Sequence, residues 1–288
     1  MKKALLIGLL ISTMVIGTFA QESKIFSLEL GSYDVFMMVE TQRQGNPEIL
    51  IGANDALLKR YIPEGGYMHS TNTFLIKAPD RNILIDTGLG EAIFDHLDEL
   101  EVSPESINAI LITHLHGDHF SGLQKDGKAL FPNAKVYLSK RELEYWTRTN
   151  VNQAAVAALI PYGSRVETFE PSLLDGKLSE LLPGIFPIAN YGHTPGHTIY
   201  LVENNGENII ICGDMMHVGL VQIPNPDISA TYDTNPKAAA VVRWQVLTFA
   251  AHNNFPIGGM HLVYPGIGSV RELQSRYTLA PVEENKYY

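Results

Sequence analysis

The hydrophobic and polar positions of the chain form short strand-like runs that alternate with helical patterns. Apolar runs at 74–77 and 82–86 flank a turn containing Pro79, which predicts a pair of strands. Asn205-Gly206 predicts a second tight hairpin. Further strands are predicted at 109–113, 135–139, 166–169, 185–190, 198–202 and 208–212, and helices at 91–100, 141–148 and 235–253. Strands and helices mixed in this way, in two strand-rich halves, indicate two sheets with helices outside them.

The last helix has the clearest boundary signals. Asn235 suits the N-cap position, and Pro236 suits the first helical turn. The residues expected on its apolar face are Val241, Val242, Val246, Leu247 and Phe249. This face is expected to pack against one of the sheets.

The N-terminal part of the chain differs from the rest. Residues 1–20 contain two lysines, a long apolar run and small exit residues, which predicts a signal peptide that ends at Ala20. An uncleaved membrane anchor is the alternative, because the apolar run approaches the roughly 17 residues of a short span. We favour an exported protein, periplasmic or secreted, with no stable membrane anchor. Residues 21–72 scatter aromatic and Met residues among polar ones, which favours an N-terminal extension packed on a catalytic domain at 73–288.

The composition is that of a folded globular protein, with 45% hydrophobic and 18% charged residues. The net charge is −10 and no basic cluster is present, which argues against a nucleic-acid partner. Cys212 is the only cysteine, so no intrachain disulfide can form. The core, a metal or both must therefore hold the fold together.

The strongest chemical signal is the hexapeptide His-Leu-His-Gly-Asp-His at 114–119, directly after a predicted strand. Four ligand-type side chains lie within these six residues, and zinc binds His nitrogen and carboxylate oxygen. Three further candidates also follow apolar strands: the Gly-His-Thr-Pro-Gly-His segment at 192–197, Asp214 and His261. All of them could therefore meet at one rim of a two-sheet core.

Together with Asp86-Thr87-Gly88 upstream, these motifs resemble the metallo-β-lactamase superfamily. The resemblance extends from about residue 73 to residue 269. It implies an α/β fold of the αββα type, in which two mixed β-sheets are flanked by helices and a dinuclear metal site lies at one edge. Residues 213–217, Val221-Gln222, the segment 233–261 and residues 264–268 resemble one branch in particular, which contains methyl parathion hydrolase and the N-acyl-homoserine lactonases.

The resemblance implies two Zn²⁺ ions per chain, although other divalent metals suit the same donors. The implied ligands are His114, His116 and His193 for the first ion, Asp118, His119 and His261 for the second, and Asp214 as the bridge between them. Such a pair leaves room for a bridging hydroxide as nucleophile, because a metal lowers the pKa of bound water from 15.7 to about 7.

Residues beside the motifs have more open roles. Asp118 and Asp214 are candidate catalytic residues as well as ligands, and His217 is the third candidate. His217 stands where the better-known lactonases usually have Tyr, so a catalytic group and a histidine of the pocket wall are equal alternatives. Asp86 is expected to orient a ligating histidine, with a simple turn cap as the alternative, and His197 is expected to support its loop. Further expectations are a buried structural thiol for Cys212, pocket wall or core for Tyr145 and Trp146, and surface or packing roles for His69, His96 and His252.

These observations favour hydrolysis of a small neutral lactone or ester, with N-acyl-homoserine lactone as the leading substrate and quorum quenching as the role. No Arg or Lys cluster accompanies the metal motifs to hold a phosphate monoester. Phosphotriester hydrolysis is the alternative, and a metal-stabilised binding protein without catalysis is the further one. Asp214 resembles a bridging carboxylate that β-lactam-hydrolysing members lack. The oligomeric state stays open, homodimer included.

Overall fold

The computed structural model describes residues 24–274 and 276–283. The expected signal peptide at 1–20 lies outside these residues and stays a prediction. In the described part of the chain, no helix is both long and apolar enough to cross a membrane.

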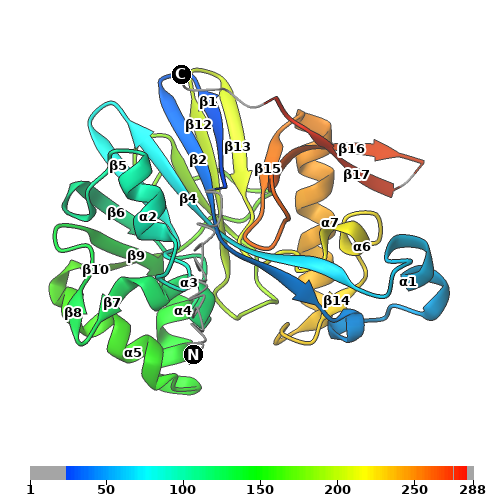
Figure 1. The fold of residues 1–288 in the computed structure, drawn as a ribbon, viewed down its shortest axis with the longest axis horizontal. Coiled ribbons are helices and arrows are strands. Elements are labelled where there is room, and N and C mark those ends of the chain that lie inside the picture. The colour runs from blue at the N-terminus through cyan, green and yellow to red at the C-terminus, as the bar shows by residue number, and fades with distance from the viewer. Residues whose placement is uncertain (1–23, 275, 284–288) are drawn as a thin grey trace, which may run out of the picture.

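The first strand-rich half forms a mixed seven-stranded sheet (Figure 1). The strands, in spatial order, are β1 (Ile25–Leu30), β2 (Tyr33–Gly45), β4 (Tyr67–Ala78), β5 (Arg81–Ile85), β6 (Ile107–Leu111), β9 (Lys135–Ser139) and β10 (Val166–Phe169). The first four pair antiparallel, and β5, β6, β9 and β10 run parallel. The predicted hairpin around Pro79 is the β4–β5 connection, so that prediction is confirmed.

The second half forms a six-stranded sheet. The strands, in spatial order, are β11 (Ile185–Ala189), β12 (Thr198–Asn204), β13 (Glu207–Ile211), β15 (Pro256–Gly258), β16 (Ile267–Leu273) and β17 (Arg276–Pro281). Only the β13–β15 pair in this sheet is parallel. Asn205 and Gly206 connect β12 and β13 with φ angles of 53° and 85°, the positive values that a tight hairpin turn requires. The Asn-Gly signal therefore located this turn correctly.

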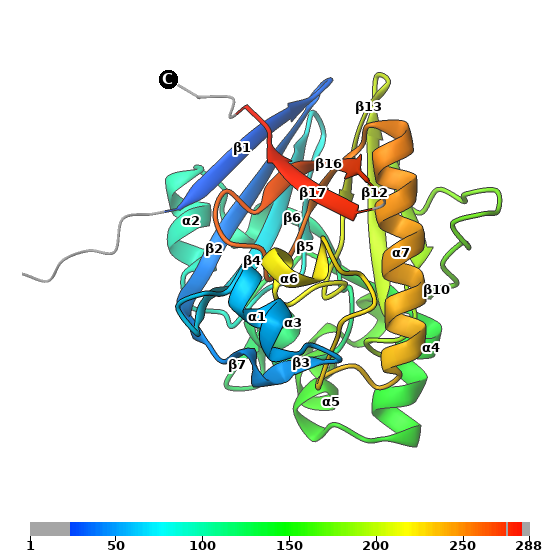
Figure 2. The same ribbon diagram turned by 90° about the vertical axis from the view of Figure 1, so that its right-hand side faces the viewer.

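Helices cover the outer faces of both sheets (Figures 1 and 2). On the first sheet these are α2 (Ile93–Glu99), α3 (Gly117–Phe120), α4 (Lys140–Glu144) and α5 (Gln153–Leu159), and on the second sheet α7 (Pro236–Asn253). Side chains alternate across each strand, so Ile83 and Ile209 pack between the sheets. Their neighbours Leu84 and Ile210 pack outward, Ile210 in the same cluster as Leu247 of α7. The expected αββα fold is confirmed.

Short elements complete the chain. A small lobe contains β3 (Leu50–Ile51), which pairs with β14 (Ser229–Ala230), together with α1 (Asp55–Tyr61) and α6 (Gly219–Gln222). The others are the hairpin of β7 (Gln124–Lys125) and β8 (Lys128–Ala129), the 3-10 turns η1 (Pro47–Ile49), η2 (Pro104–Ser106), η3 (Ser121–Leu123) and η5 (Ile160–Arg165), and the π-helical turn η4 (Tyr145–Thr149).

Three expectations about these elements need correction. The described part of residues 21–72 is not an extension laid on the domain, because β1 and β2 are strands of the first sheet and the expected boundary at 72 falls inside β4. The predicted helix at 141–148 begins as α4 but continues as the π-helical turn. On α7, Val241 is 55% exposed, and the fully buried Arg243 takes a place on the inner face. The reason is that Arg243 donates hydrogen bonds to three main-chain carbonyls that α7 covers.

Candidate metal centre

Every ligand expected from the sequence lies in a segment that follows a strand. The first sheet supplies residues 114–119, which run from the loop after β6 into α3. The second sheet supplies His193 after β11, Asp214 after β13 and His261 after β15. The structure brings all seven expected ligands together where these strand ends meet between the two sheets.

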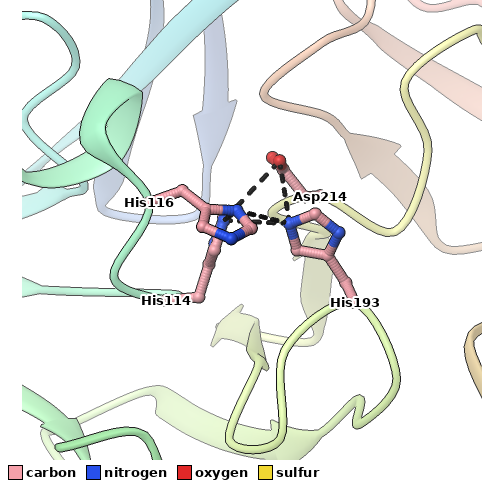
Figure 3. A group of neighbouring side chains, drawn as sticks. All are labelled: His114, His116, His193 and Asp214. Carbon is pink, nitrogen blue, oxygen red and sulfur yellow. Dashed lines mark hydrogen bonds and ion pairs between the residues drawn. The ribbon is translucent and has the colours of Figure 1, made fainter. Parts of the chain in front are cut away.

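Four of the ligands point toward one position, as Figure 3 shows. Nδ1 of His116 lies 3.0 Å from Nε2 of His114 and 2.9 Å from Nε2 of His193. Oδ2 of Asp214 lies 3.3 Å from Nε2 of His193 and 3.6 Å from Nε2 of His114. Three ring nitrogens that face one another compete for the same space as donors or acceptors, whereas a shared cation satisfies all three. We call these four residues the first ligand group.

Asp118, His119 and His261 form the second ligand group, with their ligand atoms within 4.8 Å of one another. Nε2 of His261 lies 3.5 Å from Oδ2 of Asp118. Asp214 reaches this group too, because Oδ1 lies 3.0 Å from Nε2 of His119 and Oδ2 lies 3.1 Å from Nε2 of His261. Asp214 therefore stands between the two groups, where a bridging carboxylate has to be.

The buried polar atoms of the centre fit a metal better than they fit one another. Nε2 of His119 and Oδ1 of Asp214 are buried and lie 3.0 Å apart, but their geometry does not form a hydrogen bond, and neither atom has another hydrogen-bond partner among the described residues. Buried polar atoms nearly always have such a partner. Burial opposes a charge on Asp214, yet the surrounding histidines, His119 foremost, hold the pKa of its carboxyl well below the usual range. Burial and the neighbouring His119 lower the pKa of His114. Burial also opposes a charge on His119, His193 and His261, but the neighbouring Asp214 raises their pKa values, to about 9 for His193. These three rings would therefore release protons on binding a metal ion, which takes ionised carboxylates and neutral imidazoles.

Asp86 has the position expected of a residue that orients a ligating histidine. Nδ1 of His119 donates to Oδ2 of Asp86 at 2.7 Å. Thr113 donates twice more, from its main-chain N–H at 2.8 Å and from its hydroxyl at 2.7 Å. These contacts direct Nε2 of His119 toward Asp214, the role that such outer partners have in metal sites.

Asp233 orients His193 in the same way, a role that the sequence patterns did not predict. Nδ1 of His193 lies 3.0 Å from Oδ1 of Asp233, and the main-chain N–H of Ala230 donates to Oδ2 at 2.9 Å. The guanidinium of Arg243 lies 3.8 Å from the same carboxylate. Asp233 follows His193 by 40 residues and lies in an irregular segment before α7, so its role depends on tertiary contacts alone.

His197 and Cys212 have the supporting positions expected of them. Nε2 of His197 accepts a hydrogen bond from the main-chain N–H of Asp214 at 3.0 Å, and its Nδ1 lies 3.0 Å from the carbonyl of Asn190. Both ring nitrogens are thus used to hold loops. Cys212 is fully buried beside the second sheet, and burial raises the pKa of its thiol.

Two further histidines lie beside the second ligand group. Nε2 of His217 is 3.3 Å from Oδ2 of Asp214, and the His217 ring stacks on that of His261 with centroids 5.0 Å apart. The ring of His69 also packs against the ring of His261, with centroids 4.5 Å apart. The main-chain carbonyl of Ser70 accepts a hydrogen bond from Nδ1 of His261 at 2.7 Å. The buried Nδ1 atoms of His217 and His69 make no hydrogen bond with the described residues. His69 thus has a packing role, one of the two alternatives expected for it, and its partner is an expected ligand.

A cavity of about 1080 Å³ opens from the centre, since His217 and His261 both line it. The small lobe and the β16–β17 hairpin form its other walls. Its wall includes Arg60, Tyr61, Met68, Leu220, Val263, Leu273 and Arg276. Tyr145 and Trp146, expected in the pocket wall or in the core, do not line this cavity. Trp146 packs against the core of the first sheet and edge-on against His116, with ring centroids 5.5 Å apart.

The sequence model of the metallo-beta-lactamase superfamily matches residues 66–265, most of the chain. The chain therefore belongs to this superfamily.

Solved structures with the same fold cover nearly the whole chain. AbOPH, a hydrolase of the beta lactamase superfamily, is 28% identical, with a TM-score of 0.84 over 92% of this chain and 100% of that chain. AidC, described as a dizinc quorum-quenching lactonase and solved with a product, N-hexanoyl-L-homoserine, is 22% identical, with a TM-score of 0.81 over 91% of this chain and 98% of that chain.

Curated relatives match more locally. The uncharacterized protein YobT of Bacillus subtilis (strain 168) is 29% identical over 148 residues, which is 50% of this chain and 60% of that protein. A hydroxyacylglutathione hydrolase of Francisella tularensis subsp. novicida (strain U112) is 32% identical over 134 residues, which is 44% of this chain and 42% of that protein. The chain thus spans about half the length of these relatives.

Proposed function

We propose that the chain is an exported dinuclear zinc hydrolase that opens lactones or neutral esters, with N-acyl-homoserine lactone as the leading substrate. The first ligand group would hold one ion and the second group the other, with Asp214 shared. When bound, zinc would activate a water molecule at neutral pH and polarise the substrate's carbonyl oxygen. AidC, which has this fold, is described as a dizinc lactonase. Export rests on residues 1–20.

The cavity beside the metal centre carries the assignment of substrate class. Its volume is slightly above the roughly 300–1,000 Å³ of small-molecule sites. Large apolar side chains stand exposed along it, with Leu220 62% and Leu273 64% accessible, and Met68 and Val263 beside them. Exposed apolar side chains gathered around one cavity favour a ligand with an apolar tail. An acyl chain would cover them while the lactone ring lies at the metals.

Two arginines at the cavity change one expectation from the sequence, which showed no Arg or Lys cluster beside the metal motifs. Arg276 donates to the Tyr61 hydroxyl at 2.8 Å, and the guanidinium of Arg60 lies 5.4 Å from the centre of the Tyr61 ring. Because these arginines line the cavity, the lack of an Arg or Lys cluster beside the metal motifs no longer argues against anionic substrates. Guanidinium N–H groups also donate to neutral carbonyl oxygens, of which an acyl-homoserine lactone has several. We therefore still propose that the bond hydrolysed is that of a neutral lactone or ester, and this proposal rests on the apolar side chains of the cavity wall.

His217 is the side chain we assign to the substrate. It lines the cavity, its ring touches Asp214 at 3.3 Å, and its Nδ1 has no hydrogen bond with the described residues. Burial lowers the pKa of His217 to about 4, so the ring is neutral at pH 7. A neutral imidazole can donate one hydrogen bond to an oxygen on which negative charge develops.

The deciding experiment compares kcat/KM for a long-chain acyl-homoserine lactone and for an aryl dialkyl phosphotriester on one zinc-loaded preparation. We expect the lactone to be preferred by about a hundredfold, about 2.7 kcal/mol of transition-state discrimination. The phosphotriester is the second candidate because residues 213–217 and 264–268 resemble methyl parathion hydrolase. The opposite preference would assign that activity instead. Two bound zinc ions with turnover of neither substrate would contradict the lactonase proposal and favour a metal-stabilised binding protein.

A further inference from the structure

Glu142 of α4 is a fully buried carboxylate with an unusual set of partners. Its Oε1 accepts hydrogen bonds from the main-chain N–H of Leu115 at 2.9 Å and from Nε1 of Trp146 at 2.6 Å. Its Oε2 accepts from the Thr194 hydroxyl at 2.7 Å and from the main-chain N–H of Gly196 at 2.9 Å. All four partners donate, so the site suits an acceptor-only, ionised carboxylate.

The segments joined by this carboxylate carry the three histidines of the first ligand group. Leu115 lies between His114 and His116, in the loop after β6 of the first sheet. Thr194 and Gly196 follow His193, in the loop after β11 of the second sheet. One side chain therefore ties together two ligand loops that come from opposite sheets.

The packing around Glu142 is as close as its hydrogen bonding. A Cβ atom built on Gly196 would lie 2.2 Å from the main-chain N of Glu142, so only glycine fits there. Trp146, held by Glu142, packs edge-on against the ring of the ligand His116. The helix, both ligand loops and this ring thus form one contact unit.

We propose that Glu142 is a positioning residue for the first ligand group, setting the distance between the His114–His116 loop and the His193 loop before a metal binds. The proposal rests on the metal centre of the proposed function. The second ligand group has separate anchors, since Asp86 holds His119 and the carbonyl of Ser70 holds His261. Loss of Glu142 therefore weakens the binding of one ion more than the binding of the other. This difference in affinity distinguishes a positioning role from general stabilisation of the fold.

The test variant is Glu142→Gln, which keeps the side-chain size. An amide has one acceptor oxygen and one NH₂ group, so in either orientation an N–H faces a main-chain N–H of one ligand loop. Outer partners of metal ligands are typically worth about 10–100-fold in metal affinity. In a competition titration with a zinc chelator, wild type should bind two ions, and Glu142→Gln should bind one as tightly as wild type and the other about 10–100-fold more weakly. The visible spectrum of the Co²⁺-substituted protein should change for one ion only.

The matched control is Glu40→Gln. Glu40 is also buried, and it accepts from the main-chain N–H groups of Glu91 and Ile93 at the start of α2. This variant should lose stability in urea denaturation but keep both zinc affinities. Equal weakening of both ions in Glu142→Gln, or unchanged affinities, would overturn the proposal.

A second variant covers the case in which Glu142→Gln does not fold. Thr194→Val removes one donor to Glu142 and keeps the side-chain shape, and it should weaken the same single ion by a smaller factor. Unchanged affinities in that variant would then overturn the proposal. These titrations contain no substrate, so they test the role of Glu142 independently of the substrate. A wild-type protein that binds two ions but opens no lactone would refute only the substrate assignment, and the zinc affinities of the variants would still decide the role of Glu142.

Discussion

Replacing Asp86 by Asn should disturb the second ligand group through His119 alone. The substitution keeps the side-chain volume. It also keeps the positive φ of 59°, which Asn adopts as readily as Asp. The carboxylate accepts from three donors, namely the Thr113 N–H, the Thr113 hydroxyl and Nδ1 of His119. If the amide oxygen of the new Asn side chain accepts the hydrogen bond from the Thr113 N–H, its NH₂ group faces Nδ1 of His119. The imidazole can accept from that NH₂ only by moving its own proton to Nε2, the nitrogen that would bind metal.

The magnitude follows from these contacts. Loss of an outer partner costs about 10–100-fold in metal affinity, about 1.4–2.8 kcal/mol at 1.4 kcal/mol for each factor of ten. The metal-free protein should also lose about 1–3 kcal/mol of unfolding free energy, because Asp86 is fully buried and one of its donors becomes unsatisfied. The expected result is one ion bound normally, one bound weakly, and lower stability without metal.

The assay is a zinc titration against a chelator, combined with urea denaturation of the metal-free protein. Asp80→Asn is the control, because Asp80 lies on the adjacent turn, pairs only with Arg81 among the ion pairs of the described chain, and has a side chain that is 67% exposed. It should change neither quantity. Wild-type affinity for both ions in Asp86→Asn would refute the argument that this carboxylate selects the tautomer of His119.

Three further predictions concern the shared ligand, the cavity wall and the buried thiol. Asp214→Ala should lose the metal pair and nearly all hydrolysis, whereas His197→Ala should lose less of both, as elemental analysis and kcat/KM on one preparation can check. Leu220→Asp should raise KM about tenfold for a long-chain lactone. This is the effect of losing contact with one or two methylenes, at about 0.8 kcal/mol each. If the ratio of KM for long-chain and short-chain lactones does not change, the acyl chain does not lie in this cavity. Cys212 should resist a thiol reagent in the native protein and react after denaturation, because it is fully buried and burial raises its pKa; rapid native labelling would contradict this.

Much of the fold could be predicted because its signals are local. The Asn205-Gly206 hairpin, the cap at Asn235 and the buried strand at 135–139 each depend on a few adjacent residues, and all are present in the structure. Residues 21–72 were harder. β2 is a long strand buried between neighbours on both sides, so it lacks the regular alternation of a half-exposed strand, and its assignment depends on pairing with β4.

The sequence by itself determined which residues could bind a metal, because each ligand lies in a short motif directly after an apolar strand. What surrounds those ligands was decided only by the tertiary structure. Asp233 reaches His193 across 40 residues, and Glu142 joins loops that lie 27 and 52 residues away from it. Arg60 and Arg276 reach one cavity from opposite ends of the described chain. A motif records which side chains are neighbours along the chain, whereas hydrogen-bond partners and cavity walls are selected by distance in space, which the packing of the two sheets sets.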